Sequence, residues 1–309
     1  MEIGVLGYSG SRNIGDYVQT KAVIDILNTQ KIKILDREQL HAYRGAQIKT
    51  IVNGWFMENP KNWPPSKNID PLFISFHINP SVKHNLINKE SINYLKKHQP
   101  IGCRDYYTRD LLNENGINAY FSSCVTLGIE RKNYLKKQPA GALVVGVFDR
   151  LKPNLDCKSV LKFFVSLFKY PFKFLNYNIK FYKLNNHLQK QKIEIKNYDQ
   201  ITNKSINSHE EGIELAEKML QKIAESKVII TSRIHAALPA LAMGLKVVFI
   251  DEGLNHNNHR MRLSGLRNYF QTVTLKDFFM INLDTIQSNK NHMSHTRSIN
   301  QTIKKFKAQ

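Results

Sequence analysis

The chain has 309 residues, 42% of them hydrophobic, and a formal net charge of +20. This length predicts two domains of roughly 150 residues each, and no run approaches the ~20 apolar residues that a membrane helix needs. The charge favours an acidic partner (nucleic acid, anionic lipid or a phosphorylated small molecule), although the abundance of Lys, Asn and Ile explains part of it as composition alone.

The start of the chain predicts a strand, a loop and a helix. Residues 2–7 are an apolar run typical of a buried strand, and residues 7–15 collect Gly, Ser and Asn as loops do. Asp16 is expected to cap a helix over residues 17–28, where apolar side chains recur at helical spacing. A strand, a glycine-rich loop and a helix are typical of the opening of a Rossmann-like domain.

Strands and helices continue to alternate along the chain, and this pattern predicts parallel sheets covered by helices. Further strands are expected at residues 31–35, 50–53, 72–76, 100–103, 142–147, 227–231 and 246–250, and helices at 91–97, 105–115, 234–243 and after the capping box that begins at Ser208. A polar linker is expected at residues 130–139. We therefore predict an α/β fold of two Rossmann-like domains, 1–135 and 140–287, facing each other across a cleft, followed by a frayed polar tail, 288–309.

Three segments resemble the polysaccharide pyruvyl transferase family. They are Asn-Ile-Gly-Asp at 13–16, Gly-Cys-Arg-Asp at 102–105 and Thr-Ser-Arg-Ile-His-Ala-Ala at 231–237, and the similarity extends to about residue 275. The resemblance implies a two-domain fold of the GT-B type, phosphoenolpyruvate as donor without a further cofactor, and a glycan or lipid-linked sugar as acceptor. Many members have a glycine-rich segment where residues 53–57 have one glycine.

The donor that this resemblance implies carries a carboxylate and a phosphate close together, which guanidinium groups bind well. Arg233 is predicted at the end of a strand and just before a helix, where α/β sheets bind ligands and where a helix N-terminus favours anions. Arg104 has the same predicted position in the first domain. Together the two would clamp one anion; the alternative for each is an ion pair with a nearby carboxylate, such as Asp105.

His235 follows Arg233 by two residues. The implied reaction needs a proton at the methylene carbon of phosphoenolpyruvate, and a group with a pKa near 7 suits that task. We therefore predict His235 and Arg233 as catalytic residues, with Ser232 as a neighbouring substrate contact. A structural or solvated histidine is the alternative.

The first loop supplies further predicted substrate contacts, Asn13, Gly15 and Asp16. The spacing Gly10-x-x-x-x-Gly15 is that of a P-loop, but Asp16 stands where the lysine is required, so a nucleoside triphosphate site is disfavoured. For Asp16, a helix cap alone is the alternative to orienting an acceptor hydroxyl.

Residues 255–263 form a basic stretch in which His256, His259, Arg260 and Arg262 are candidates to contact the phosphate side of the substrate, and His259 and Arg260 are the predicted contacts. A solvated loop is the alternative. A metal site that used His256 and His259 would need a third ligand that the sequence does not place, so no metal is predicted.

Residues 161–177 alternate aromatic and aliphatic residues with lysines. An amphipathic core helix that ends at Pro171 is the first interpretation, and contact with an anionic membrane surface is the second.

Cys103, Cys124 and Cys157 are widely spaced without a Cys-x-x-Cys pair, and no basic region precedes the first strand. We therefore expect a cytoplasmic protein without disulfides or a signal peptide, with peripheral contact at the inner face of the membrane as an extension of that prediction.

Two other functions compete with the transfer of pyruvate. A nucleotide-sugar glycosyltransferase of the GT-B type would need a carboxylate to grip a ribose, and Glu252 is the candidate. Nucleic-acid binding is not predicted, because the lysines are scattered along the chain and no binding module is recognised.

Overall fold

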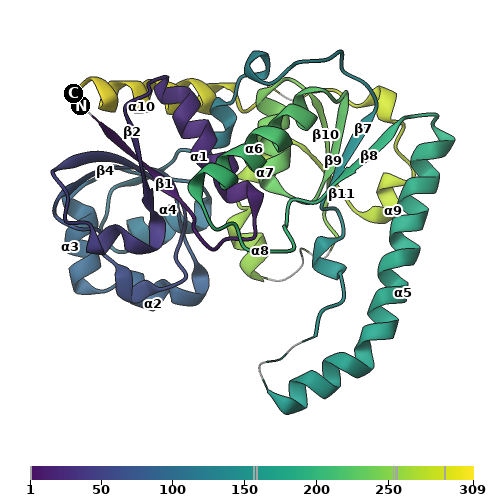
Figure 1. Ribbon diagram of the computed structural model, residues 1–309, viewed down its shortest axis with the longest axis horizontal. Coiled ribbons are helices and arrows are strands. Elements are labelled where there is room, and N and C mark those ends of the chain that lie inside the picture. The colour runs from purple at the N-terminus through teal and green to yellow at the C-terminus, as the bar shows by residue number, and fades with distance from the viewer. Residues whose placement is uncertain (1, 156, 158, 253, 255–256, 289) are drawn as a thin grey trace.

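The computed structural model describes residues 2–155, 157, 159–252, 254, 257–288 and 290–309, without the side chains of residues 150 and 257–259. In this part of the chain, parallel strands form two sheets and helices cover both (Figure 1). The strands are β1 (Ile3–Gly7), β2 (Ile32–Asp36), β3 (Ile48–Phe56), β4 (Ile69–Ile78), β5 (Ile101–Cys103), β6 (Ala119–Phe121), β7 (Ala142–Val145), β8 (Ile195–Tyr198), β9 (Val228–Thr231), β10 (Lys246–Ile250) and β11 (Gln271–Val273). The predicted α/β class with two parallel sheets is confirmed.

The helices lie between these strands and after them. They are α1 (Ile14–Leu27), α2 (Lys83–Leu86), α3 (Lys89–Lys97), α4 (Tyr106–Glu114), α5 (Val160–Lys190), α6 (His209–Ala224), α7 (Ile234–Ala242), α8 (Asn257–Arg262), α9 (Leu275–Phe278) and α10 (Met293–Ala308).

The two sheets have the same internal order. The first runs β2-β1-β3-β4-β5-β6 and the second runs β11-β10-β9-β7-β8. In both, the first strand in sequence pairs with the second on one side and with the third on the other, which is the order of flavodoxin-like sheets. The point where the order reverses, called the switch point, lies between β1 and β3 in the first sheet and between β7 and β9 in the second. Ligands of such sheets bind at the carboxyl ends of the strands beside this point.

The molecule has two halves, the first built around the sheet of β1–β6 and the second around the sheet of β7–β11. The two halves share a hydrophobic core. α1 of the first half packs against α6 and α7 of the second, and one continuous set of buried apolar side chains runs from Val5 and Val23 to Met219 and Leu238. A second, smaller core fills the other face of the second sheet, around Val248 and Phe278. The structure is thus compatible with two Rossmann-like units, which the shared core joins firmly; the predicted GT-B-like cleft stays a prediction.

The predicted cap of α1 is wrong. The helix begins at Ile14, and the side chain of Asn13 accepts a hydrogen bond from the backbone N–H of Gly15 at 3.1 Å. Asp16 lies inside the first turn, where it accepts hydrogen bonds from Ser11 and from Asn13. Both Asn and Asp are good caps, so composition alone does not distinguish positions three residues apart.

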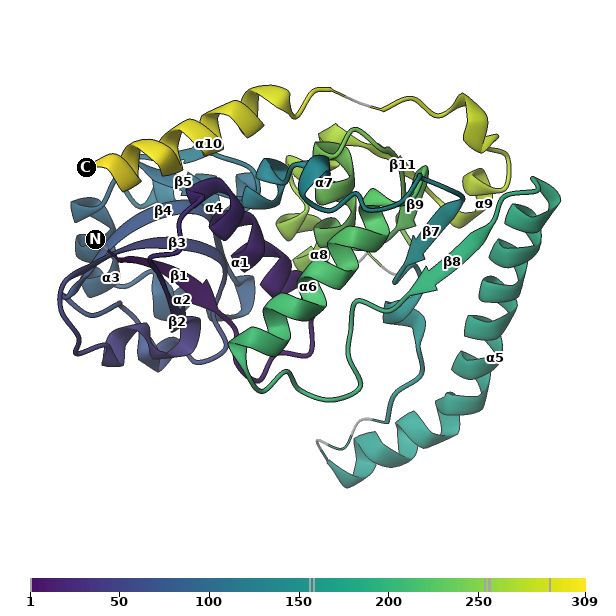
Figure 2. The ribbon, with the colours of Figure 1, turned by 45° about the horizontal axis from the view of Figure 1, so that its top comes forward.

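The expected frayed tail is also wrong. α10 returns to the first half and lies beside α1 (Figure 2). Ile299 and Ile303 are buried in the shared core, and Lys49 donates a hydrogen bond from Nζ to the backbone oxygen of Phe306. The polar composition of the segment reflects one solvated face of an amphipathic helix.

The third correction concerns residues 161–177. They do not form a core helix that ends at Pro171, because α5 continues through this proline to Lys190. Only the second half of α5 is anchored, by the fully buried Leu184 and Leu188, whereas the first half projects from the body (Figures 1 and 2). Proline costs a helix one backbone hydrogen bond and often bends it, but does not always end it.

Candidate active site

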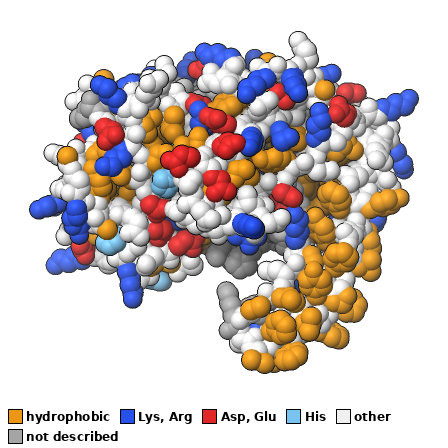
Figure 3. All heavy atoms as spheres, in the orientation of Figure 1, with side chains coloured by type: hydrophobic (Ala, Val, Ile, Leu, Met, Phe, Trp, Pro, Cys, Tyr) orange, Lys and Arg blue, Asp and Glu red, His pale blue; other side chains and the backbone are white. Residues whose placement is uncertain are grey.

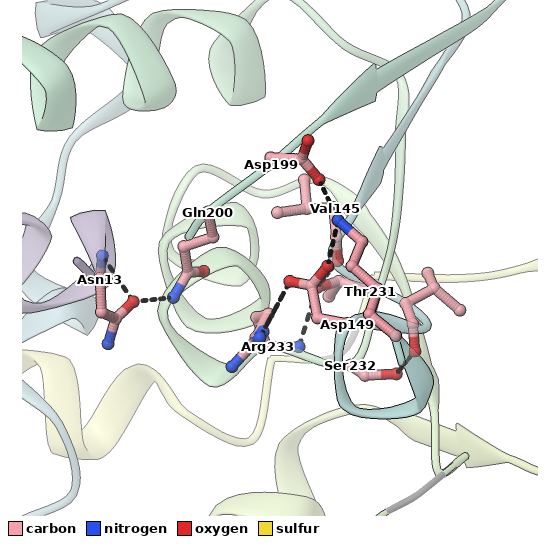
Figure 4. A network of polar contacts seen from close by, with 11 residues as sticks. Asn13, Val145, Asp149, Asp199, Gln200, Thr231, Ser232 and Arg233 are labelled. Atoms are coloured by element: carbon pink, nitrogen blue, oxygen red, sulfur yellow. Dashed lines mark hydrogen bonds and ion pairs between the residues drawn. The ribbon is translucent and has the colours of Figure 1, made fainter. Parts of the chain in front are cut away.

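The start of α1 meets the second half of the molecule directly. The backbone N–H of Ile14 donates to the backbone oxygen of Gln200 at 2.9 Å. The side chain of Gln200 donates from Nε2 to Oδ1 of Asn13 at 2.7 Å (Figure 4). A Cβ atom on Gly15 would lie 2.8 Å from Nδ1 of His235. The predicted contacts Asn13, Gly15 and Asp16 thus lie beside the predicted catalytic histidine, and glycine is required at residue 15 by this close approach.

Arg104 is a fully buried cation without a hydrogen-bonded partner. It follows β5, its side chain is 0% exposed, and within the described residues none of its three guanidinium nitrogens makes a hydrogen bond. The nearest carboxylate oxygen, Oδ2 of Asp105, lies 3.7 Å from its Nε. A buried guanidinium in this state is costly, so the geometry favours a site for an anionic ligand.

Arg262, at the end of α8, brings a second cation to the same region. Its guanidinium carbon lies 5.5 Å from the centre of the Trp55 ring, so this residue of the second half contacts the first sheet. Burial and the charge of Arg104 together lower the pKa of Arg262 to about 10, although Asp16 acts in the opposite direction. Two guanidinium groups that repel each other are stabilised by an anion that binds between them.

His235 is buried at the start of α7, 3% exposed, and its Nε2 has no hydrogen-bond partner in the described part of the molecule. Burial holds the pKa of His235 well below its usual value, and the charges of Arg104, Arg262 and Arg233 lower it further. In the ligand-free protein the imidazole is therefore neutral near pH 7.

A second buried histidine, His77 of β4, is paired with a carboxylate. Its Nδ1 lies 2.5 Å from Oδ2 of Asp105, the residue that caps α4. Burial lowers the pKa of His77 to about 4, despite the opposing charge of Asp105. Burial by itself would raise the pKa of Asp105, but His77 and Arg104 bring it below its usual value. Neutral His77 thus faces ionised Asp105 through Nδ1, and its Nε2 is left without a partner among the described residues.

Arg233 is the N-cap residue of α7 and is paired within its own half. Its Nε and one terminal nitrogen donate to Oδ2 of Asp149 at 3.2 and 2.9 Å (Figure 4). Asp149 also lies 3.3 Å from Nζ of Lys152. The alternative stated for each arginine, an ion pair with a nearby carboxylate, therefore holds for Arg233, because the loop after β7 places Asp149 beside it. For Arg104 the neighbouring carboxylate, Asp105, lies closer to His77, and the predicted clamp of one anion stays a prediction.

Ser232 supports the ends of the strands. Its hydroxyl lies 2.9 Å from the oxygen of Val147 and 2.6 Å from that of Ile250, both of which are possible acceptors for its one proton. The residue therefore joins the ends of three neighbouring strands, and its predicted contact with substrate stays a prediction.

The switch point of the first sheet is lined by amides. Gln19 of α1 and Asn53 of β3 are buried, and no described group bonds their side-chain amides. Gly54 follows with a φ of 85°, and a Cβ atom there would lie 2.5 Å from the hydroxyl of Tyr8 and 3.3 Å from Oε1 of Gln19. Buried amides in this state favour a ligand that both donates and accepts hydrogen bonds.

Asp16 brings a partly buried carboxyl group to the site. Burial raises its pKa, while Arg37 and the hydrogen bond from Ser11 act in the opposite direction. Arg37 itself donates to the oxygen of Trp55 at 2.9 Å and lies over the ring of Tyr8. Asp16 is thus not the cap of α1 but a carboxyl group within reach of the charges of Arg37, Arg262 and Arg104, and its predicted role in orienting an acceptor hydroxyl stays a prediction.

The remaining predictions lie at the edge of the site or outside it. The side chain of His259 and all of His256 lie outside the described residues, and Arg260 is exposed. Glu252, the candidate for gripping a ribose, forms an ion pair with Lys180 of α5. Among the described residues, no three His, Cys, Asp or Glu side chains are grouped as metal ligands.

Sequence reasoning did not list Gln19, Asn53, Asp149 or Gln200 as site residues, and it named Arg262 only as one member of a basic stretch. Arg262 lies in the basic stretch that the sequence did indicate, two residues from Arg260. Gln19 lies in α1, Asn53 lies in β3, and Asp149 and Gln200 follow β7 and β8. All four lie beside the switch points, which the strand order defines, but a single sequence does not give that order.

Comparisons with known proteins agree with this description. The family model described as "Polysaccharide pyruvyl transferase" matches residues 13–253. A solved structure, that of a functionally uncharacterised protein from Klebsiella pneumoniae, is similar in fold, with a TM-score of 0.50 and 14% identity over 88% of this chain and 93% of that one. No curated protein matches the chain significantly.

Proposed function

Because the chain belongs to the polysaccharide pyruvyl transferase family, we propose that this transferase takes pyruvate from phosphoenolpyruvate and adds it to two hydroxyls of one sugar as a cyclic ketal. The sugar belongs to a cell-surface polysaccharide or to its lipid-linked precursor. The observation that carries the proposal is Arg104, a fully buried guanidinium with no hydrogen-bonded partner in the described structure, beside Arg262.

The donor binds between these two arginines. Its carboxylate and phosphate carry nearly three negative charges, and each guanidinium offers a planar pair of donors to such oxygens. The start of α7 adds backbone N–H groups on the same side. Arg233 lies at this helix start and serves the phosphate side when its bond to Asp149 is exchanged for one to the ligand.

The reaction proceeds by addition and loss of phosphate. A proton adds to the methylene carbon of phosphoenolpyruvate, the neighbouring carbon becomes electrophilic, and the first sugar hydroxyl bonds to it and loses its proton. The C–O bond to phosphate then breaks, and the second hydroxyl adds to the same carbon and loses its proton. Of the two protons released, one balances the proton placed on the methylene carbon, and the other leaves on hydrogen phosphate.

His235 supplies the proton to the methylene carbon. Its imidazole is neutral in the ligand-free site, since burial and three arginines lower its pKa. The bound phosphate dianion raises that pKa again, so the imidazole gains a proton as the donor binds. Binding of phosphoenolpyruvate thus protonates the histidine that later acts as the general acid.

His77 and Asp105 receive the protons of the sugar hydroxyls. Nδ1 of His77 lies between Oδ2 of Asp105 at 2.5 Å and Oγ1 of Thr108 at 3.2 Å. The carboxylate favours the tautomer with the proton on Nδ1, and in that tautomer the lone pair of Nε2, which has no partner among the described residues, accepts the proton of a hydroxyl. The amides of Gln19 and Asn53, at the neighbouring switch point, hold the sugar hydroxyls. Buried amides suit a sugar, because each amide both donates and accepts.

The test is release of inorganic phosphate from phosphoenolpyruvate in the presence of synthetic glycans or lipid-linked sugars, with mass spectrometry of the sugar product. We expect phosphate and a product 70 mass units heavier (roughly, the mass of pyruvate less water) in equal amounts. His235→Gln is the control for contaminating phosphatase, because it keeps the shape of the side chain but transfers no proton near pH 7. Phosphate release without a heavier sugar, or equal turnover by the variant, contradicts the proposal.

A further inference from the structure

α5 presents a hydrophobic stripe to solvent, most of it on the first half of the helix. Seven apolar residues recur at a mean spacing of 3.5 residues and so lie on one face of the helix: Leu161, Phe164, Phe168, Phe172, Leu175, Ile179 and Tyr182. Phe164, Phe168 and Phe172 are 61%, 75% and 66% exposed. Figure 3 shows apolar side chains gathered over the projecting end of the molecule. Each large apolar side chain left in water forgoes about 1.5–3 kcal/mol of burial, so a continuous stripe indicates a binding surface.

The same helix is cationic. Residues 160–190 contain six lysines and no Asp or Glu. Lys162, Lys169 and Lys173 lie together on another face of the helix, to one side of the apolar stripe. No ion pair joins them to another described residue, whereas Lys180 is paired with Glu252. An aromatic and aliphatic face backed by lysines is the pattern of helices that lie in the plane of an anionic membrane surface.

We propose that α5 docks the protein onto an anionic lipid bilayer. A second copy of the chain is a poorer partner for this surface. It would place the same lysines, and a second net charge of +20, next to those of the first copy, and the like charges would repel each other. Among the described helices, α5 included, none combines enough length with enough apolar character to cross a bilayer. The exposed stretch of about 20 residues spans roughly 30 Å along the surface.

The anchored half of α5 connects this surface to the candidate site. Tyr177 and Phe181 line a pocket together with Asp149, the partner of Arg233. A docked α5 therefore keeps this side of the site within roughly 30 Å of the lipid. If the proposed function holds, an acceptor carried on a lipid is presented there; docking itself does not depend on the reaction.

Sedimentation with vesicles tests the proposal. The full chain is mixed with vesicles of phosphatidylcholine alone, or of phosphatidylcholine with about 30% phosphatidylglycerol, at low salt and at roughly 0.5 M salt. We expect binding to the anionic vesicles, loss of most of it at high salt, and little binding to the neutral ones. No binding to anionic vesicles, or equal binding to both kinds, overturns the proposal.

Two sets of variants distinguish the contribution of the apolar stripe to vesicle binding from that of the lysines. The triple variant Phe164→Glu, Phe168→Glu, Phe172→Glu should abolish binding while the melting temperature stays within a few degrees, since these side chains are mostly exposed and have little burial to lose. The triple variant Lys162→Glu, Lys169→Glu, Lys173→Glu should weaken binding about a hundredfold, because each lysine near an anionic surface contributes about a factor of five. The matched control Lys31→Glu, Lys136→Glu, Lys137→Glu makes the same charge change at exposed positions outside α5 and should keep at least half of the binding.

The oligomeric state is measured by light scattering on the same proteins. If the wild type is a dimer that the aromatic triple variant converts to a monomer, and neither binds vesicles, α5 is an interface between copies and the proposal is overturned. Equal loss of binding in the control variant overturns it as well, because a general attraction of the basic chain would then suffice.

Discussion

Gly15 and His235 are in direct contact across the boundary between the two halves: a Cβ atom on Gly15 would lie 2.8 Å from Nδ1 and 2.9 Å from Cβ of His235. The first turn of α1 and the first turn of α7 therefore fit together only because residue 15 has no side chain. The two segments that resemble the family at 13–16 and 231–237 are in this way one site.

Gly15→Ala should damage the site more than the fold. The added methyl group must displace His235 or Gln200, which costs about 1–3 kcal/mol of stability and moves the imidazole from the donor. Thermal melting and phosphate release measure the two effects. The double variant Gly15→Ala, Gln200→Ala should stay impaired, because the rigid Cβ of His235 remains in contact; recovery of activity by the second substitution would show that Gln200, and not His235, is the obstacle.

Arg262→Lys should weaken donor binding by roughly ten- to hundredfold although the charge is kept, because a lysine cannot form the paired hydrogen bonds of a guanidinium. Arg104→Lys should behave in the same way. Titration calorimetry with phosphoenolpyruvate gives both affinities. Arg297→Lys, at an exposed position of α10, is the control and should bind as the wild type does. If Arg262→Lys matches this control, Arg262 does not contact the donor.

Binding of phosphoenolpyruvate should take up a proton near pH 7. The free site holds the pKa of His235 well below its usual value, and the donor phosphate raises it. Calorimetry in buffers with different enthalpies of ionisation measures the uptake directly. His235→Gln should bind the donor with similar affinity, release no phosphate, and show the uptake reduced by the contribution of one histidine. The same proton uptake in the variant would move the acid to another residue.

The ligand-free protein should lose stability as the pH falls from about 6.5 towards 4. His77 and His235 both have pKa values in the folded state below the usual value of the unfolded chain, so the unfolded state binds more protons in this range. Stability is therefore complete above about pH 6.5 and falls by up to about 1.4 kcal/mol per pH unit for each histidine below it.

Denaturant unfolding at pH 7, 6 and 5 measures this slope. His235→Gln should flatten it by about one proton, whereas His84→Gln, at an exposed position, should leave it unchanged. A slope that His235→Gln does not alter would mean that the imidazole titrates normally in the folded protein.

The sequence predicts best the strands that form long apolar runs. Apolar runs such as those of β9 and β10 were placed to within a residue, because a strand buried on both faces is apolar throughout. β6, β8 and β11 were missed. They have three or four residues each and lie at or next to sheet edges, where half-exposed side chains leave no apolar run.

The sequence predicted which charged residues belong to the site but not which residues they pair with. The sequence indicated Arg104, Arg233 and His235, and the structure brings all three into one charged region, with Arg104 and Arg233 both acting on the pKa of His235. It did not indicate that Asp105 pairs with His77, which leaves Arg104 without that partner, or that Asp149 pairs with Arg233. Each of these pairs joins residues far apart in the chain, and only the order of the strands brings them together.

The return of α10 to the first half has a mechanical consequence. The chain crosses between the halves after β6 and crosses back before α10, so two tethers join bodies that also share a core. Two chain connections restrict how one half moves relative to the other, because sliding or separation of the halves would stretch at least one connection. Any rotation of one half against the other would also have to separate side chains of the shared core, and Ile299 and Ile303 of α10 belong to that core.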